Sequence, residues 1–560
     1  MQSDLEIARQ VKLKSISEIL SQLGIDEDDF QYYGKYTGKI KLSVLDKLSS
    51  KPDGKLILVT AMSPTNFGEG KTLTTIGLGL ALNKIGKKGI ITLREPSVGP
   101  VFGMKGGAAG GGHSQVLPME MINLHFNGDL GAITAAHNLL AAMLDNHIFK
   151  GNDLGIDVTN ILWNRTMDMN DRSLRQIVLG LGGRINGVPR ESGFVITAAS
   201  EVMAILALAE SRKDLKERLG AIAVGYTHDR KLVYARDLQA NNAMAVLLND
   251  AIMPNLVQTS EHTPALVHAG PFANIAHGTN SIIADKVALK LADYVVTECG
   301  FGADLGAEKF FNIVCRNNPM WPSAVVVVAT CRAIKFHGGV SAKPESLLYE
   351  ENPDAFKKGL MNLEVHINNM KKFGVPVIAA VNRFPKDTPA EIKMIFDLCQ
   401  KLEVECTTHE AFLKGGEGAV ELAQKAVKLA DANPDPQKNF LYGLDIPVEE
   451  KIRTIATQIY GAKDVYFEKR AKVKIDKFVE LGYGNIPVCI AKTQMSLSDN
   501  PRAIGAPRNW TLTVTDANLS AGAGFLVIVC GDMMLMPGLP KIPAAANMDV
   551  DENGVITGLF

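Results

Sequence analysis

The stretch that most constrains this 560-residue chain runs from Lys55 to Leu82. The apolar, β-branched run Lys55–Met62 predicts a strand, and the apolar pattern after Thr72 predicts a helix. Between them lies the turn Thr65-Asn66-Phe67-Gly68-Glu69-Gly70-Lys71-Thr72. A glycine-containing turn between a strand and a helix is typical of a phosphate-binding loop, because its backbone N–H groups can face phosphate oxygens.

The residue types in this turn agree with that interpretation. Gly68 and Gly70 lack the Cβ atoms that would keep a ligand away from the backbone. Lys71 is placed to reach the outer phosphates, and Thr72 offers a hydroxyl to Mg²⁺. The first glycine of the usual G-x-x-x-x-G-K-[ST] pattern is Thr65 here, and an ordinary strand-to-helix turn is the alternative. We interpret residues 65–72 as a nucleoside-triphosphate site.

A second candidate site follows the next predicted strand, Gly89–Leu93. In open α/β sheets, ligands collect outside the carboxyl ends of the strands. Arg94, at such an end and near a phosphate loop, is placed to hold a transferring phosphoryl group or an acyl phosphate. The glycine-rich run from Gly103 to His113 costs conformational entropy unless its backbone must approach something closely. The alternative is a surface Arg94–Glu95 pair beside a flexible linker.

Strand-like and helix-like runs alternate along the chain, which predicts the α/β class with a mostly parallel sheet covered on both faces. The strand-like runs before residue 331 are Lys55–Met62, Gly89–Leu93, Gly193–Ala199, Ala221–Gly225, Asp293–Thr297 and Ala324–Thr330. The chain is too long for one core. We predict a nucleotide-binding domain over residues 1–360, a smaller α/β domain over 361–447 and a C-terminal α/β domain over 448–560.

Composition excludes several classes of protein. The formal net charge is −1 and basic runs are absent, so we expect no nucleic-acid partner. The apolar runs are strand-sized, so we expect no membrane span. The N-terminus lacks the pattern of a secretory signal, and the seven cysteines form no Cys-x-x-Cys pair, which together favour a reducing, cytoplasmic location. Histidine, cysteine and carboxylate spacings indicate no transition-metal site, so Mg²⁺ carried by the nucleotide is the divalent metal we expect.

Two phenylalanines complete the candidate residues. Phe384 ends one predicted strand and Phe412 follows the next. Aromatic side chains at the ends of successive strands can sandwich a flat heterocycle. From spacing alone, phenylalanines at such positions are more often ordinary core or rim residues.

Several motifs, in one order, resemble those of the formate–tetrahydrofolate ligase family, and the resemblance covers nearly the whole chain. They are Pro64–Thr72, Arg94-Glu-Pro-Ser-Val-Gly-Pro100, Gly106–Gly112, Ile122–Asp129, His268–His277, Phe301–Lys309 and Met536–Lys541. The resemblance implies that ATP, formate and tetrahydrofolate give 10-formyltetrahydrofolate, ADP and phosphate through formyl phosphate.

The same resemblance implies roles for single residues. Lys71 and Thr72 would handle the phosphates and Mg²⁺, Arg94 would hold the formyl phosphate, and Phe384 and Phe412 would stack on the pterin. It also implies a homotetramer activated by a monovalent cation, K⁺ or NH₄⁺.

Three positions depart from the family pattern: Phe412 stands where tryptophan is expected, Gly131 where histidine is expected, and Arg383 where a small residue is expected. Three other functions compete with the ligase. A P-loop switch ATPase of the partition or cell-division type would carry a second lysine where Asn66 stands. A folate- or nucleotide-binding scaffold would bind without turnover, and another acyl-phosphate ligase would use a different carboxylate.

Overall fold

The computed structural model describes residues 2–104, 107 and 109–559 of the chain. The predicted strand–turn–helix unit is present: β3 (Lys55–Ala61) runs into the turn, and α4 (Lys71–Lys84) begins directly after Gly70. β3 lies inside the large sheet, between β16 (Tyr294–Glu298) and β17 (Ala324–Ala329). The candidate phosphate loop therefore starts from a central strand.

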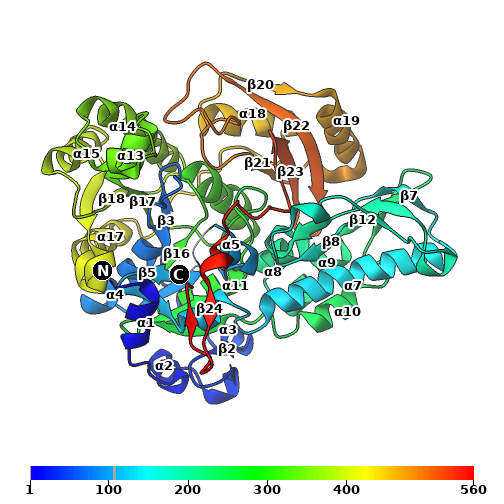
Figure 1. Ribbon diagram of the computed structural model, residues 1–560, viewed down its shortest axis with the longest axis horizontal. Helices are drawn as coiled ribbons and strands as arrows, with labels where there is room; N and C mark the ends of the chain where they lie inside the picture. The colour runs from blue at the N-terminus through cyan, green and yellow to red at the C-terminus, as the bar shows by residue number, and fades with distance from the viewer. Residues whose placement is uncertain (1, 105–106, 108, 560) are drawn as a thin grey trace.

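The large sheet holds 12 strands among the described residues, in the order β1-β2-β14-β15-β4-β16-β3-β17-β18-β19, with β6 beside β14 and β5 beside β6. Neighbouring strands from β15 to β19 are parallel, and the pairs at the other end are antiparallel. The predicted α/β class is therefore confirmed (Figure 1). The remaining strands of this sheet are β1 (Phe30–Tyr32), β2 (Gly38–Ile40), β4 (Gly89–Leu93), β5 (Gly110–Gly111), β6 (Ser114–Leu117), β14 (Asn255–Thr259), β15 (Pro264–Val267), β18 (Val377–Asn382) and β19 (Glu405–His409).

Helices cover both faces of the parallel strands, and the alternation of side chains along β3 shows why. Ile57 and Val59 pack in one core with α4 and α17 (Val420–Ala432). Leu56 and Leu58 point to the opposite face, into the core that also contains α11 (Ile282–Leu291) and α14 (Pro353–Lys371). Because successive residues of a strand face opposite sides, a strand buried on both sides must be apolar throughout.

Two of the predicted strand regions lie outside the large sheet, so the expectation that they continue the parallel alternation is wrong. β11 (Phe194–Ile196) pairs with β8 (Arg165–Met167). β12 (Ala223–Thr227) lies between β7 (Ile156–Ile161) and β13 (Leu232–Tyr234) in an antiparallel sheet. The link from β12 to β13 is too short for the crossover that parallel strands need.

The C-terminal part, residues 448–560, has its own sheet in the order β20-β22-β23-β21. Its elements are α18 (Val448–Gln458), β20 (Asp464–Phe467), α19 (Lys469–Phe478), β21 (Val488–Ala491), β22 (Thr511–Ser520) and β23 (Phe525–Cys530). By contrast, β18 and β19 continue the large sheet, although they lie beyond residue 361. The three-domain division stays a prediction.

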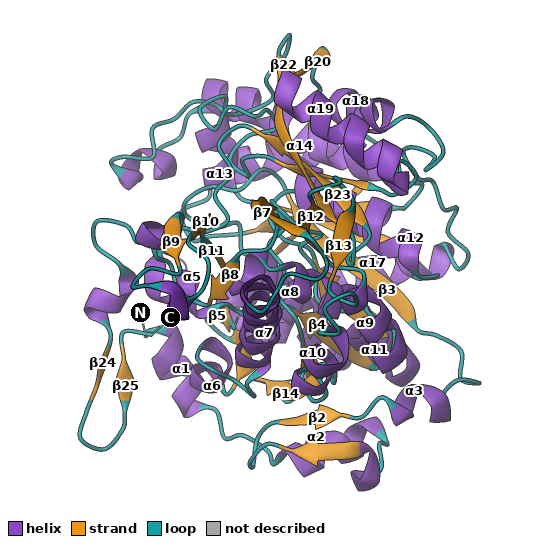
Figure 2. Cartoon of the chain, turned by 90° about the vertical axis from the view of Figure 1, so that its right-hand side faces the viewer, coloured by secondary structure: helices purple, strands orange, loops and turns teal. Residues whose placement is uncertain are grey.

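The chain returns from the C-terminal part to the N-terminal region, and the two termini lie side by side in both views (Figures 1 and 2). The returning segment ends in the hairpin β24 (Asp549–Val550) and β25 (Ile556–Thr557). Arg9 Nη2 donates to the Ile556 carbonyl at 2.6 Å, which joins this hairpin to α1 (Asp4–Gln10).

The other α-helices and the β9–β10 pair lie around these sheets. They are α2 (Ile16–Leu23), α3 (Ser43–Lys47), α5 (Val98–Gly103), α6 (Met119–Asn123), α7 (Asp129–Phe149), α8 (Glu201–Leu208), α9 (Arg212–Gly220), α10 (Asn241–Leu247), α12 (Cys315–Asn317), α13 (Cys331–His337), α15 (Pro389–Lys401), α16 (Ala411–Lys414), β9 (Ile177–Leu179) and β10 (Arg190–Ser192). None of the helices in the described residues is long and apolar enough to cross a membrane.

Candidate active site

Two glycines shape the predicted phosphate loop. Gly68 and Gly70 have φ values of +73° and +77°, in the left-handed region that favours glycine. Gly70 is also crowded by the neighbouring strand β18, because a Cβ atom there would lie 2.3 Å from Asn382 Nδ2. Asn382 Nδ2 donates to the Glu69 carbonyl at 3.2 Å. The turn is thus held against the carboxyl end of β18.

Two of the predicted nucleotide-binding residues bond to the loop itself. The buried Glu69 carboxylate accepts a hydrogen bond from the Thr65 backbone N–H at 2.6 Å. The Thr65 hydroxyl oxygen accepts one from the Phe67 N–H at 3.2 Å. Burial raises the pKa of Glu69. Asn66 is exposed at the tip of the turn. Thr65 and Glu69 therefore define the shape of the loop and face inward.

The start of α4 is open to an anion. Lys71 is its first residue and is partly exposed, and the described residues provide no side-chain cap for its first N–H groups. Uncapped N–H groups and the positive end of the helix dipole together attract negative charge. A lysine at this position adds a full positive charge to the same place.

A carboxylate joins the predicted phosphate loop to the second candidate site. Glu298 is the last residue of β16, between β3 and β4, and is buried. Its Oε2 accepts a hydrogen bond from the Thr72 hydroxyl at 2.8 Å, and its Oε1 lies 3.7 Å from Arg94 Nη2. The structure therefore brings Thr72 and Arg94 together through Glu298. The sequence analysis did not identify Glu298 as a candidate site residue, although a carboxylate at the end of an apolar strand can indicate one.

Arg94 follows β4 and is held in a crowded, mostly buried place. Its side chain is 23% exposed, and a Cβ atom on Gly300 would lie 2.9 Å from its Nη1. Arg94 Nε is buried and has no hydrogen-bond partner in the described part of the chain. A guanidinium with an unpaired N–H donor, at the carboxyl edge of the sheet, is suited to bind a phosphate or carboxylate ligand.

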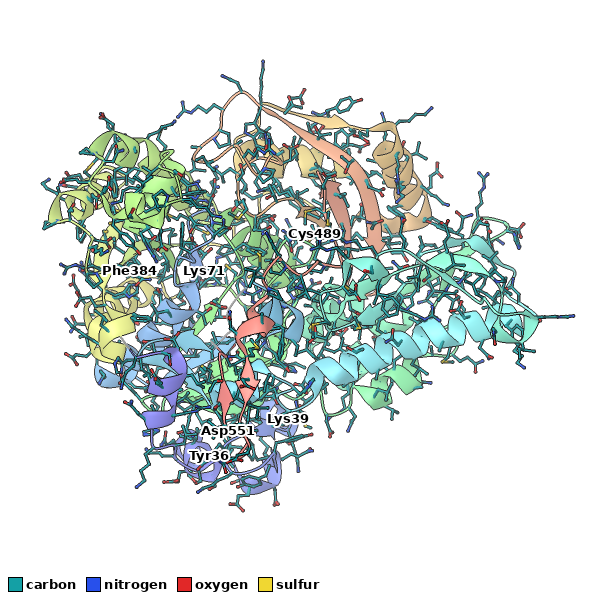
Figure 3. All side chains as sticks on the ribbon, in the orientation of Figure 1. Tyr36, Lys39, Lys71, Phe384, Cys489 and Asp551 are labelled. Atoms are coloured by element: carbon teal, nitrogen blue, oxygen red, sulfur yellow. The ribbon has the colours of Figure 1, made fainter. Side chains whose placement is uncertain are left out.

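The two candidate aromatic residues lie after the adjacent strands β18 and β19, and no ring contact joins them among the described contacts. Both are partly exposed. Arg332 of α13 lies on the Phe384 ring, with its Cζ 4.2 Å from the ring centroid, and 5.8 Å from that of Phe67 in the phosphate loop. Phe384 and Lys71 both lie in the left half of the view in Figure 3. Nothing in the sequence pattern singled out Arg332.

The glycine-rich run approaches the chain itself. The His113 N–H donates to the Phe412 carbonyl at 2.9 Å, and a Cβ atom on Gly112 would lie 2.9 Å from Phe412 Cγ. Gly112 N–H also donates to Asp4 Oδ1 at 2.8 Å. The described glycines of the run thus allow close packing beneath Phe412. Lys105, Gly106 and Ala108, also in this run, lie outside the described residues.

The structure also shows the surroundings of the other two departures from the family pattern, Arg383 and Gly131. Arg383 is exposed and turned toward Glu410, with 3.4 Å between Nη1 and Oε1. Gly131 lies in the first turn of α7, and a Cβ atom there would meet no atom within 4 Å. A side chain at position 131 would therefore fit without steric conflict.

A comparison with protein families agrees with this arrangement of residues. The family model described as formate–tetrahydrofolate ligase matches residues 2–560, nearly the whole chain. The chain therefore belongs to the formate–tetrahydrofolate ligase family and is a ligase that joins formate to tetrahydrofolate.

Proposed function

We propose that this ligase uses ATP to convert formate into formyl phosphate and then transfers the formyl group to N10 of tetrahydrofolate. The observation that supports this most strongly is the connection Thr72–Glu298–Arg94, because it joins a phosphate loop to a second anion-binding group. A loop that binds ATP and an arginine that binds the acyl phosphate must be adjacent for direct phosphoryl transfer.

The chemistry explains why two anion sites are needed. The carboxylate of formate resists nucleophilic attack and lacks a good leaving group. A formate oxygen attacks the γ-phosphorus of ATP, and the bond to ADP breaks. N10 of the folate then attacks the formyl carbon, phosphate leaves with the bonding electrons, and N10 loses its proton. The products are 10-formyltetrahydrofolate, ADP and phosphate.

We assign ATP to residues 65–72, with Lys71 and the start of α4 on its outer phosphates. The Thr72 hydroxyl and the Glu298 carboxylate, 2.8 Å apart, are hard oxygen donors of the kind that Mg²⁺ prefers, so these residues fit the metal. When bound, Mg²⁺ would neutralise phosphate charge. Arg94 would hold the formyl phosphate, with Glu298 keeping its guanidinium in place.

We further propose that K⁺ or NH₄⁺ activates the enzyme by binding at Glu95 and Asp129. Both carboxylate oxygens of Glu95 are buried and lack a hydrogen-bond partner within the described residues. Burial, reinforced by the neighbouring Asp129, raises the pKa of Glu95 well above its usual value. Asp129 is paired with Lys39 at 2.7 Å, whereas Glu95 has no ion pair among the described residues, and its raised pKa favours the neutral acid. A monovalent cation bound there would be the counter-ion of the ionised form.

The pterin is assigned to Phe384 and Phe412. Aromatic stacking contributes on the order of 1 kcal/mol per pair beyond area burial. The partly exposed rings at the ends of β18 and β19 support this assignment. Arg332, on the Phe384 ring, would hold that ring in place and connect it to the phosphate loop.

A prediction follows for Arg332. Arg332→Leu is expected to raise KM for tetrahydrofolate about fivefold, because a cation–π contact contributes about 1 kcal/mol. Arg316→Leu is the matched control, since the Arg316 guanidinium lies 4.1 Å from the Phe440 ring centroid, away from these residues. Steady-state kinetics with varied tetrahydrofolate would measure both. Equal KM values for the two variants would contradict the role of Arg332.

We also propose that the enzyme is a homotetramer and that it is cytoplasmic. Apolar side chains exposed around the β9–β10 pair support an interface between copies, with exposed fractions of 54% for Val178, 66% for Leu181 and 87% for Ile185. All seven cysteines are free and buried, which favours a reducing location. Light scattering coupled to size-exclusion chromatography would measure the mass of the particle.

The proposed reaction is tested by measuring 10-formyltetrahydrofolate made from ATP and tetrahydrofolate, with and without formate, and with and without K⁺ or NH₄⁺. We expect product that requires formate and increases with the cation. Binding of ATP and folate without turnover would indicate the scaffold. Product only with a different carboxylate would indicate another acyl-phosphate ligase. The family match along nearly the whole chain and the absence of a lysine at Asn66 argue against a switch ATPase.

A further inference from the structure

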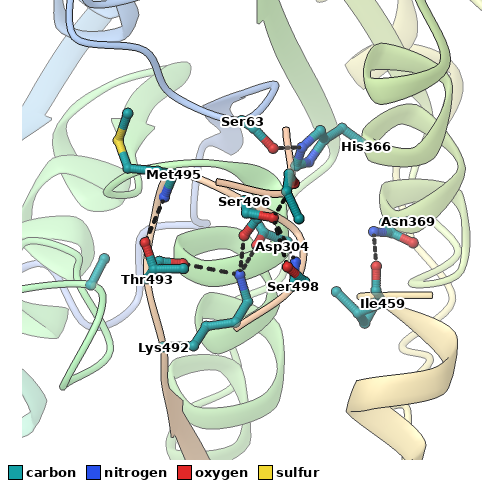
Figure 4. A network of polar contacts seen from close by, with 12 residues as sticks. Ser63, Asp304, His366, Asn369, Ile459, Lys492, Thr493, Met495, Ser496 and Ser498 are labelled. Atoms are coloured by element: carbon teal, nitrogen blue, oxygen red, sulfur yellow. Dashed lines mark hydrogen bonds and ion pairs between the residues drawn. The ribbon is translucent and has the colours of Figure 1, made fainter. Parts of the chain in front are cut away.

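The first residues after β3 are tied to two helices that lie outside the phosphate loop. Ser63 is buried, and each of its polar atoms has a partner. Its backbone N–H donates to Asn362 Oδ1 at 3.1 Å, and its hydroxyl oxygen accepts from Asn362 Nδ2 at 3.0 Å. The same hydroxyl lies 3.0 Å from His366 Nε2 (Figure 4). The Ser63 carbonyl accepts from His337 Nε2 at 2.9 Å.

The side chains that hold Ser63 also hold a segment of the C-terminal part. Asn362 Nδ2 donates to the Gly505 carbonyl at 2.7 Å, and the Gly505 N–H donates to His337 Nδ1 at 3.2 Å. Ser63 on one side and Gly505 on the other are therefore both hydrogen-bonded to Asn362 and His337. Because Nδ1 of His337 accepts, the proton of the neutral ring lies on Nε2, where it is donated to Ser63.

The segment that contains Gly505 is itself held firmly. It begins after β21 with Lys492, whose Nζ lies 2.8 Å from Asp304 Oδ2 and donates to the Ser496 carbonyl at 2.6 Å. Both members of this ion pair are fully buried (Figure 4). Ser496 Oγ in turn donates to the Ala503 carbonyl at 2.6 Å. Residues 492–505 thus form a compact connection from the C-terminal sheet to Ser63.

We propose that Asn362 is a positioning residue that makes ATP binding depend on how the C-terminal segment 492–505 is seated. Asn362 does not touch the proposed nucleotide site. It fixes Ser63, from which the chain enters the loop at Thr65, and it does so while bonded to Gly505. A shift of that segment would move Asn362 and, through it, Ser63, because a side-chain amide held by three hydrogen bonds has little freedom to move. This inference rests on the proposed binding of ATP by residues 65–72.

The same helix provides a matched control. Asn369 lies seven residues after Asn362 on α14, is 1% exposed, and donates from Nδ2 to the Ile459 carbonyl of the C-terminal part at 2.7 Å. It therefore joins the same two parts of the molecule and, among the described contacts, bonds to neither Ser63 nor the loop. Leucine has the same branching as asparagine, so the two substitutions keep a similar shape; Asn362→Leu removes three side-chain hydrogen bonds and Asn369→Leu removes two.

The test measures Tm, KM for ATP and KM for tetrahydrofolate in the full-length enzyme for both variants. Both are expected to lower Tm. Asn362→Leu is expected to raise KM for ATP about tenfold, because part of the free energy of its three lost hydrogen bonds no longer holds the entry to the loop, while KM for tetrahydrofolate stays within about twofold. Asn369→Leu should leave both KM values within about twofold of those of the unmodified enzyme. Equal KM values for ATP in the two variants would overturn the proposal.

Two further variants complete the design. Lys71→Ala reports on the proposed function: ATP affinity unchanged in that variant would mean that the loop itself is misassigned.

If Asn362→Leu does not fold, Gly505→Ala replaces it, because Gly505 has φ +80° and a Cβ atom there would lie 2.7 Å from the His337 carbonyl oxygen. Gly524→Ala is its control, with φ +82° and open space around the Cβ. A higher KM for ATP in Gly505→Ala alone would support the proposal, and equal values would overturn it.

Discussion

Lys71→Ala is expected to lower kcat for formate-dependent synthesis of 10-formyltetrahydrofolate about a thousandfold. Lys71 is the first residue of α4, where uncapped N–H groups already favour an anion. Its ammonium would stabilise charge that moves onto the phosphoryl oxygens during transfer. Removing a single group that stabilises transition-state charge typically costs a factor of about 10² to 10³, and phosphoryl transfer relies heavily on such groups.

The control for this variant lies on the same helix. Lys84 is the last residue of α4 and is paired with Glu261 at 3.0 Å, at the end of the helix farthest from the loop. Lys84→Ala removes the same charge and should keep kcat within about twofold, since exposed ion pairs contribute little. If Lys71→Ala also retained near-normal kcat, the phosphate loop would have no part in the chemistry.

The local parts of the site could be predicted from the sequence, because strand, turn and helix follow one another directly. The fold class could be predicted for the same reason: β3, β4, β16 and β17 are short, apolar and bounded by turns. A glycine at position 70 can be expected in such a turn, and its φ of +77° agrees. Arg94 could be placed near the loop because the carboxyl ends of parallel strands share one edge.

The connections between distant strands could not be predicted. Glu298 contacts both Thr72 and Arg94 because β16 lies between β3 and β4 in the sheet, an order that the sequence does not reveal. Arg332 reaches Phe384 and Phe67 from a separate helix. The strands near residues 194 and 223 lie in small separate sheets, β11 paired in parallel with β8 and β12 in an antiparallel sheet. Short apolar runs do not reveal which sheet they will join, so the sequence could not separate these strands from those of the large sheet.

Glu298→Gln is expected to lower kcat about a hundredfold and to raise the Mg²⁺ concentration needed for half-maximal activity. Glutamine keeps the size of the side chain and a carbonyl oxygen that can accept the Thr72 hydroxyl. It lacks the negative charge that lies 3.7 Å from Arg94 and that, in our proposal, faces the metal. Arg94 would lose its counter-charge and its orientation together. Kinetics at varied Mg²⁺, with ATP saturating, would measure both effects.

Glu201→Gln separates these effects from the general cost of removing a buried carboxylate. Glu201 also sits in a desolvated place, where burial raises its pKa to about 7, and its Oε1 accepts from the Gly522 and Ala523 N–H groups. Glutamine retains that acceptor, and no hydrogen bond or ion pair joins Glu201 to the predicted phosphate loop among the described contacts, so the Mg²⁺ requirement should not change. A Glu298→Gln enzyme with an unchanged Mg²⁺ requirement and kcat would show that the carboxylate only fills space between β3 and β4. A higher Mg²⁺ requirement in Glu298→Gln but not in Glu201→Gln would instead support a role for the negative charge of Glu298 in binding the metal and orienting Arg94.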